Sequence, residues 1–299
     1  MAVRNQQGLT EAEFLARYDA SRFERPSVSV DMVICTVTNE VPDDDHRKLP
    51  DKVLRVLLVK RGDHPCLGSW ALPGGFVNMD EDLDTAAARE LQEETGITGI
   101  YMEQLYTWGE VGRDPRTRVI SCSYLSLVDA ESLQIRAGDD AADARWFTVR
   151  ETPLQAIRTM TEHGYVLEER SRLTFRAGAV EVGGVIRVVR TVTGKVTRVE
   201  RQIEESAGLA FDHLKIIDYG LERLRTKAEW SDIAFNLMPD RFTMAELRKV
   251  YETILGRELH AANFRRDVGR MVEETNDFRQ EGGHRHAKLF RFNPRWSER

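Results

Sequence analysis

Apolar residues along the chain follow two spacings, and each spacing predicts a type of element. In the front half, runs rich in Val, Ile and Thr predict strands near 27–38, 53–60, 100–108, 119–128 and 144–148. Among them, residues 84–95 have the period of a helix, which ends at Gly96, a residue suited to the left-handed position after a helix. A mixed order of strands around one helix favours an α/β sandwich over a doubly wound sheet.

The first residues predict a short helix of their own. Thr10 and Glu13 have the spacing of a capping box, so a helix should begin there with Phe14, Leu15 and Tyr18 on its apolar side. The segment 42–46, which contains Pro and three Asp, is turn-like.

The pattern changes after residue 148. Residues 150–163 predict a helix, and residues 173–203 then alternate Val and Ile with Arg and Thr around the turn signals Gly183-Gly184 and Thr193-Gly194. We interpret this stretch as two or three short strands. Its basic residues are Arg187, Arg190, Lys195, Arg198 and Arg201. They form either a DNA-facing arm or the solvated face of a β-hairpin, and we favour the hairpin.

Helical spacing returns at 209–227, where Leu, Ile and Phe recur every three to four residues and the opposite face is polar. Such a helix would be about 28 Å long. Because it lies between two predicted domains, it could be a spacer, a dimer seam or both.

The last seventy residues predict three helices and a hairpin, in that order. A short helix at 231–237 stops before Pro239, a capping box at 243–246 opens a second helix, and a third begins near Ala261. The third helix should point Phe264, Val268, Met271 and Val272 inward. A Gly282-Gly283 turn then joins two extended segments ending at residue 292. This is the order of a winged helix-turn-helix.

The predicted outward face of the third helix suits base recognition, since Arg pairs with guanine and Asn with adenine in the major groove. Its residues are Asn263, Arg265, Arg266 and Arg270. In the wing, His284, Arg285 and Lys288 could contact phosphates. Helical periodicity alone would leave a protein-binding domain as the alternative.

Composition narrows the class of protein. With 31% charged and 41% hydrophobic residues and a net charge of −6, the chain has the make-up of a soluble globular protein. It contains neither a signal peptide nor an apolar run long enough to span a membrane, so we expect a cytoplasmic location without membrane contact. Cys35, Cys66 and Cys122 are far apart, which argues against a zinc site.

The most specific motif starts at Gly75. From there the sequence reads, without a gap, Gly, five residues, Glu, seven residues, then Arg-Glu-apolar-any-Glu-Glu-any-Gly-apolar, ending at Ile97. This pattern is the Nudix box, and the front of the chain therefore resembles the Nudix superfamily. The resemblance implies an α/β/α sandwich.

The glutamates of the box indicate a metal site. Glu90 and Glu94 are four apart on one helix face, where like charges destabilise the helix unless a cation is present. Mg²⁺ or Mn²⁺ is the expected cation, because hard cations take oxygen ligands. Glu93 is a further candidate ligand, and Arg89 can pair with it. The resemblance implies that these glutamates bind the metal beside the Gly-Gly turn.

The residue that activates water is left open by the sequence. Glu93 and Glu81 of the box are the candidate catalytic residues. The acids at Asp139, Asp140 and Asp143 are alternatives, because a group outside the box often serves in ADP-ribose hydrolases.

A basic turn at 106–118 resembles the ligand loop of the ADP-ribose branch of Nudix proteins. Its candidate ligand-binding residues are Arg113, Asp114, Arg116 and Arg118. Many ADP-ribose hydrolases have a proline about fifteen residues past the box, where this chain has Val111-Gly112. The alternative is a surface hairpin with solvated arginines.

The whole chain resembles the Nudix-related transcriptional regulators, called NrtR-like. The tail carries the segments Ala234-Phe-Asn-Leu-Met-Pro, Phe242-Thr, Asn263-Phe-Arg-Arg and Ala287-Lys-Leu-Phe-Arg-Phe. The resemblance implies a bacterial repressor that binds operator DNA as a homodimer and senses ADP-ribose or a related nucleotide of NAD metabolism. Many members have an eroded box and this chain does not, so hydrolysis of ADP-ribose to AMP and ribose 5-phosphate is the alternative function.

These expectations divide the chain into three parts. Residues 1–155 form the Nudix domain, 156–228 a linker with a β-hairpin insert and a connecting helix, and 229–299 the winged helix-turn-helix domain.

Overall fold

The structure, a computed structural model, describes residues 3–40, 51–96, 98–130, 144–281 and 285–297. Its helices are α1 (Glu11–Arg17), η1 (Ala20–Arg22), α2 (Leu83–Thr95), α3 (His213–Ala228), η3 (Ile233–Leu237), α4 (Met244–Leu255) and α5 (Ala261–Val268). Its strands are β1 (Ser27–Asn39), β2 (Lys52–Lys60), β3 (Trp70–Ala71), β4 (Gly74–Phe76), β5 (Tyr101–Trp108), β6 (Val119–Leu127), β7 (Ala144–Thr161), β8 (Gly164–Ala177), β9 (Val180–Thr193), β10 (Val196–Ala207), β11 (Phe242–Thr243), β12 (Val272–Glu281) and β13 (Arg285–Phe292).

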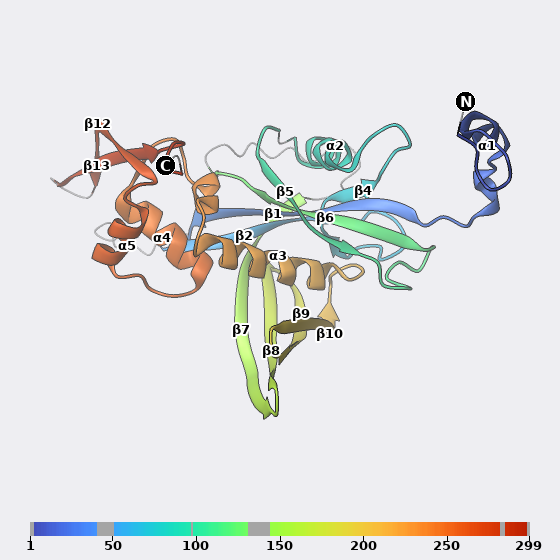
Figure 1. Ribbon diagram of the computed structural model, residues 1–299. Helices are drawn as coiled ribbons and strands as arrows, with labels where there is room; N and C mark the ends of the chain where they lie inside the picture. Colours follow the sequence, from blue (N-terminus) through green and yellow to red (C-terminus); the bar gives the residue numbers. More distant parts are fainter. Residues whose placement is uncertain (1–2, 41–50, 97, 131–143, 282–284, 298–299) are drawn as a thin grey trace.

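A large mixed sheet forms the centre of the molecule, with strand order β10-β9-β8-β7-β2-β1-β6-β5. Neighbouring strands in this order are antiparallel except β1 and β6, which are parallel. Helix α2 covers one face and α3 the other (Figure 1). The predicted α/β sandwich is therefore confirmed.

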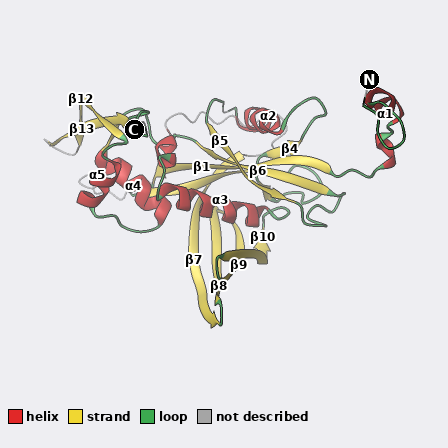
Figure 2. Ribbon diagram, in the orientation of Figure 1, coloured by secondary structure: helices red, strands yellow, loops and turns green. Residues whose placement is uncertain are grey.

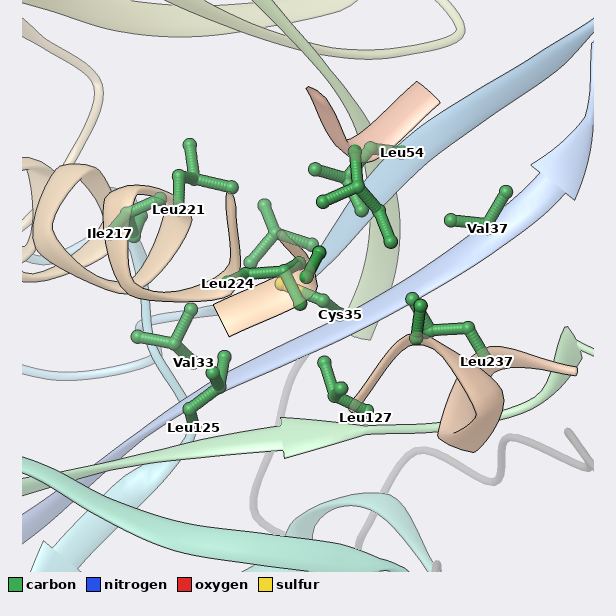
Figure 3. Close-up of a cluster of buried hydrophobic side chains, with 14 of the residues drawn as sticks. Val33, Cys35, Val37, Leu54, Leu125, Leu127, Ile217, Leu221, Leu224 and Leu237 are labelled. Atoms are coloured by element: carbon green, nitrogen blue, oxygen red, sulfur yellow. The ribbon is translucent and has the colours of Figure 1, made fainter. Parts of the chain in front are cut away.

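Alternation along β1 produces the two layers. Met32 and Ile34 point into the cluster that contains Ala87 of α2. Val33 and Cys35 point to the opposite face, into the larger cluster that α3 completes. Figure 3 shows this second cluster, in which Ile217, Leu221 and Leu224 of α3 lie over the apolar residues of β1 and β6. Because successive side chains of a strand point to opposite faces of the sheet, the apolar residues of β1 contribute to both buried clusters.

The predicted helix at 150–163 is wrong. Strand β7 continues to Thr161 and pairs with β8 from Thr148 opposite Arg176 to Thr161 opposite Gly164. Leu154, Ile157 and Met160 recur at helical spacing, but this local pattern is overridden by pairing along the full length of β8. In Figure 2 these strands project from the sandwich as a long extension.

The turn predicted at Gly183-Gly184 is also wrong, although the one at Thr193-Gly194 is confirmed. Both glycines of the first pair lie inside β9. A Cβ at Gly183 would lie 2.1 Å from the carbonyl oxygen of Leu173, and one at Gly184 would lie 2.0 Å from that of Glu205. These glycines permit close approach of the neighbouring strands instead of a turn.

Three arginines of β9 and β10 form ion pairs within the chain. Arg187 binds Glu168 and Arg190 binds Glu222, at 2.7 and 2.6 Å. The side chain of Arg201 is 7% exposed and binds Asp218 at 3.1 Å. Because these charges are compensated intramolecularly, the geometry supports the β-hairpin alternative over a DNA-facing arm.

Helix α3 begins at His213, four residues later than the predicted start at 209. Residues 208–210 bond to Trp70 instead, which donates to the carbonyl of Gly208 and accepts from the amide of Ala210, both at 2.8 Å. Most of the α3 side chains that face the sheet are buried, among them Leu214, Ile217 and Leu221. The helix is therefore part of the sandwich rather than a solvent-exposed spacer.

Helix α1 forms with the predicted capping box, in which Thr10 and Glu13 bond to each other's backbone. It buries none of its residues. Phe14, Leu15 and Tyr18 are 42%, 61% and 52% exposed. Their apolar side is completed by Phe23, whose ring stacks on Tyr18 at 6.2 Å.

The tail has the predicted winged-helix order, with η3, α4 and α5 followed by the hairpin β12-β13, and β11 before α4 completes a sheet of strand order β11-β13-β12. The capping box of α4 and its end at Gly256 are confirmed. Three details differ: the first helix is a 3-10 helix, α5 ends at Val268, and Val272 opens β12. The predicted turns at 42–46 and 282–283 lie outside the described residues.

The winged helix packs directly on the sandwich. The hydroxyl of Thr253 in α4 donates to the carbonyl oxygen of Lys52, and Lys249 binds Asp51 at 3.3 Å. The core is shared as well, since Leu224 of α3 and Phe235 of η3 belong to the same buried cluster. No helix in the described ranges is both long and apolar enough to cross a membrane.

Candidate functional site

The box begins with a close contact between backbone and carboxylate. Gly74 has a φ of 153°, and a Cβ there would lie 2.1 Å from the carbonyl oxygen of Val30. A Cβ at Gly75 would lie 2.2 Å from Oε1 of Glu90. Only glycine lets β4 lie between β1 and α2 in this way, which explains the residue type at both positions.

Arg89 holds three glutamates of the box. Its guanidinium binds Glu81 and Glu90 at 2.7 Å and Glu93 at 3.0 Å, so the predicted pair with Glu93 is confirmed. The bonds from Arg89, with one from the amide of Asn78, lower the pKa of Glu81 to about 2. Glu81 is thus an ionised anchor for the arginine.

Glu94 is half-buried and lies beside the Gly-Gly turn. Its carboxylate accepts a bond from the amide of Gly74 at 3.0 Å. Burial and the nearby charge of Glu90 raise the pKa of Glu94 to about 8, and burial also raises the pKa of Glu90. Two carboxylates are therefore held together at an energetic cost that a cation would relieve.

The chemistry of these donors fits a hard divalent cation, because carboxylate oxygens of Glu90 and Glu94 lie against the Gly-Gly turn. The described residues contain no group of three acidic, His or Cys side chains arranged to hold an ion. Glu93 is 60% exposed and bonded to Arg89. The structure thus brings two of the three predicted metal ligands together and leaves Glu93 at the rim.

A hollow of about 200 Å³ lies beside the box turn. Its walls come from β1, the box, the turn at 109–118 and the start of α3, and they include Asp31, Arg61, Phe76, Arg116, Phe211 and His213. Ligand pockets for drug-sized molecules are commonly 300–1,000 Å³. The hollow is therefore sized for one part of a nucleotide.

The predicted ligand residues of the turn have different environments. Arg116 is 42% exposed, binds Asp114 at 2.7 Å and places its guanidinium over the ring of Phe76 at 5.2 Å. Arg118 bonds to the carbonyl of Gly109 at 2.7 Å. Arg116 is therefore the one of the four predicted residues whose cation combines exposure with a place in the wall of the hollow.

Arg113 is 5% exposed and committed to other residues. It binds Asp212, the residue before α3, at 2.7 Å and Asp31 at 3.5 Å. Asp31 also accepts a short bond from the hydroxyl of Ser121. Arg113 is thus a buried tie between the turn and α3.

Sequence reasoning missed Phe211, His213, Asp31 and Arg61. His213 is buried, which lowers its pKa, and its Nδ1 accepts from the amide of Leu72 at 2.8 Å. Phe211 and His213 reach the box from more than a hundred residues away, and Asp31 and Arg61 lie outside the motif, so the box pattern marks none of them. The change from polar to helical spacing at 209 is the one signal that could have drawn attention to them.

The predicted DNA-binding residues are exposed where they are described. Asn263, Arg265 and Arg266 lie on the open side of α5, while Phe264 and Val268 are buried. Arg270 is exposed but follows the helix, and Lys288 pairs with Glu274. His284 and the side chain of Arg285 lie outside the described part of the chain, as do the alternative acids Asp139, Asp140 and Asp143.

Comparison with known proteins gives matches along the chain. A family model described as the NrtR DNA-binding winged helix domain matches residues 234–292, and one described as the NUDIX domain matches residues 41–169. The ADPR responsive transcriptional repressor NtrR of Acinetobacter baylyi is 30% identical over 287 residues, which cover 95% of this chain and 88% of that protein.

Two crystal structures are similar over nearly the full length. Shewanella oneidensis NrtR complexed with a 27mer DNA has a TM-score of 0.60 at 28% identity and covers 90% of this chain and 95% of its own. The MutT/nudix family protein of Enterococcus faecalis has a TM-score of 0.65 at 28% identity, with coverage of 96% and 95%.

Proposed function

Because the chain belongs to the NrtR family of Nudix-related transcriptional regulators, we propose that it is a bacterial repressor controlled by ADP-ribose or a related nucleotide of NAD metabolism. The observation that carries this proposal is the alignment with a named ADPR responsive repressor, which spans the box and the winged helix together. A repressor acts on the chromosome, so the proposal places the protein in the cytoplasm.

Operator DNA would be bound by α5. Its open side carries Asn263, Arg265 and Arg266, and the side chains able to pair with guanine and adenine are thus free of the core. Arg270, His284, Arg285 and Lys288 would add contacts to the phosphates. The DNA-binding domain would be the segment 229–299, which follows α3 directly and begins with η3.

A homodimer would place two such helices on one operator. Half-sites one helical turn apart need two reading helices about 34 Å apart. The apolar side of α1, with Phe14, Tyr18 and Phe23 exposed, supports a contact with a second copy, because an apolar patch of this kind commonly marks an interaction surface.

The nucleotide would be bound beside the box. Arg116 offers a cation to the pyrophosphate, and the rings of Phe76 and Phe211 offer apolar walls. Glu90 and Glu94 would hold Mg²⁺ or Mn²⁺, with Glu93 at the rim. When bound, the cation would neutralise pyrophosphate charge and make a bound water more acidic.

An ADP-ribose pyrophosphatase is the alternative, and the complete box with its Arg89 clamp favours it. The two candidate catalytic residues differ in environment. Glu81 is tied by Arg89 and the Asn78 amide, whereas Glu93 is exposed and has one bond to Arg89. Of the two, Glu93 is therefore the better base in this geometry.

Helix α3 offers a path from the nucleotide to the DNA. Its first turn carries His213 in the wall of the hollow, and Asp212 just before it binds Arg113. Its last turns pack against η3 and α4 of the winged helix. A nucleotide that moves the turn at 109–118 would therefore move the base of the DNA-binding domain.

The test is a gel shift with the promoter region next to the gene for this protein. The wild-type protein should shift this DNA at moderate salt. Arg266→Ala should weaken binding about tenfold or more, as expected for loss of a base contact. The matched control is Arg176→Ala, an exposed arginine on β8. Absence of a shift by the wild-type protein would favour the pyrophosphatase.

A further inference from the structure

A second hollow of about 820 Å³ lies on the α3 side of the sandwich. It opens between the end of β5, strand β10 and one side of α3, and its walls include Tyr106, Trp108, Arg201, Lys215, Tyr219 and Arg223. None of the residues that line it also lines the hollow beside the box. Its volume is within the range of small-molecule sites.

One wall of this hollow is aromatic. The ring centroid of Tyr106 lies 4.8 Å from Trp108 and 5.2 Å from Tyr219, and Trp108 lies 5.7 Å from Tyr219. Trp108 is buried, and its indole donates to Ser123 at 2.8 Å. Tyr106 is 48% exposed, so the fixed cluster offers ring surface to the hollow. Such a surface suits a planar ring, because aromatic groups stack with favourable energy.

The charges around the hollow leave one cation poorly compensated. Lys215 pairs with Glu110, Arg190 with Glu222, and Arg201 with Asp218.

Arg223 differs from these three. The nearest carboxylate oxygen to its guanidinium is that of Glu103, at 3.9 Å. Its other bonds are to neutral groups, the carbonyl of Leu105 and the hydroxyl of Tyr219, both at 3.3 Å. Its side chain is 32% exposed. Arg223 is therefore available to an anion beside the aromatic wall.

We propose that this hollow is a second ligand site, for a nucleoside monophosphate whose base stacks on Tyr106 and whose phosphate binds Arg223. A mononucleotide has both groups that the lining residues can bind: a planar ring, and a charged phosphate that accepts several hydrogen bonds from a guanidinium. The site goes beyond the proposed ADP-ribose response, since it requires neither the box nor Arg116.

The position of the site gives it a regulatory consequence. Lys215, Tyr219 and Arg223 stand four residues apart along one side of α3, and all three line the hollow. A nucleotide bound there contacts the same helix that carries the winged helix at its far end. A nucleotide bound at the second site therefore provides a second way to change the position of α3.

The test measures binding of AMP and adenosine by equilibrium dialysis against the full chain carrying Arg116→Ala. This background weakens binding beside the box and leaves the second hollow intact. AMP should bind, and adenosine should bind about tenfold more weakly because it lacks the phosphate. Arg223→Ala should abolish the difference between the two ligands. Tyr106→Ala should weaken both about tenfold, whereas Tyr106→Phe should retain binding.

Arg176→Ala is the matched control, and it should leave AMP binding unchanged. Thermal unfolding of each variant verifies that it is folded. The proposal is overturned if the Arg116→Ala chain binds no AMP at millimolar concentration. It is equally overturned if AMP keeps its affinity in folded Arg223→Ala and Tyr106→Ala. No DNA enters the experiment, so its result is independent of whether the protein is a repressor.

Discussion

At the scale of single residues, the half-buried carboxyl of Glu94 makes the metal-free protein sensitive to pH. The pKa of Glu94 is raised to about 8 in the folded state, from an ordinary value of 4.5. Between these values the folded state keeps a proton that the unfolded chain has released. The contribution of Glu94 to stability is therefore complete below pH 4.5 and is lost as pH rises through 8.

We expect the free energy of unfolding of the metal-free protein, measured by urea titration, to fall between pH 5 and pH 8. The slope assigned to Glu94 is about 1.4 kcal/mol per pH unit. Glu94→Gln should remove this part of the slope, because its amide does not titrate. Equal slopes in the two proteins would contradict the prediction, because they would mean that the pKa of Glu94 is the same in the folded and the unfolded state.

The same pair of carboxylates predicts a metal response. Mg²⁺ added at pH 8 should raise the unfolding temperature of the wild-type protein, because the ion binds the folded state and offsets the repulsion between Glu90 and Glu94. Glu94→Gln should reduce this rise. Arg176→Ala, a substitution away from the box, should keep it. An equal rise in all three proteins would show that Mg²⁺ acts elsewhere.

Single functional residues could be predicted where the spacing of a sequence motif identifies them. Glu90, Glu94 and Arg89 were found because the box places them on adjoining helix positions, and the structure brings them together. Phe211 and His213 were not found, because they reach the hollow from the far end of β10 through a backbone with a positive φ at Phe211. The sequence alone does not show that residues so far apart in the chain lie close together in space.

At the scale of elements, the bond between Arg113 and Asp212 makes the turn at 109–118 and helix α3 one unit. Both side chains are nearly buried, so removing one partner leaves the other charge without compensation. Arg113→Ala should therefore lower the free energy of unfolding by about 3–5 kcal/mol.

The measurement is urea unfolding of the single and double variants. The destabilisation of the Arg113→Ala/Asp212→Asn double variant should be smaller than the sum of the two single destabilisations, by about 0.5–3 kcal/mol. Additive effects would contradict the coupling. Arg118→Ala is the control in the same turn, since the guanidinium of Arg118 bonds to backbone carbonyls instead of a buried acid.

Elements were predictable where their signals are local. The capping boxes of α1 and α4 and the glycine ends of α2 and α4 were found because a few adjacent residues determine them. The segment 150–161 was not, because its helical spacing competes with pairing to β8, and that pairing depends on residues up to 24 positions away. The partner strand decides the outcome there.

At the scale of the whole molecule, the two domains could be predicted from the sequence, but the way they pack against each other could not. The contact of α4 with β2, through Thr253 and the carbonyl of Lys52, joins segments about 200 residues apart. With α3 packed on the sandwich and in contact with η3, the Nudix domain and the winged helix share one core. A change at the proposed nucleotide site would therefore have a packed route to α5.

The last prediction concerns this coupling. ADP-ribose can change DNA affinity only if it binds the DNA-competent and the incompetent conformation of the protein differently. The same factor must then appear as weaker binding of ADP-ribose to the DNA complex. We expect ADP-ribose titrated into a preformed complex to release the DNA with a coupling of about 5–150-fold, measured by fluorescence anisotropy of labelled operator.

Three variants separate the parts of this coupling. Arg116→Ala should require more ADP-ribose for release while DNA affinity without nucleotide stays unchanged, because Arg116 lines the hollow and no residue of α5 does. Arg266→Ala should weaken DNA binding and leave ADP-ribose affinity of the free protein unchanged, since its side chain is exposed on α5. Arg176→Ala should change neither. If DNA affinity is the same with saturating ADP-ribose, NAD and sugar phosphates as without them, the Nudix domain is an enzyme or a scaffold, and the packed route through α3 carries no signal.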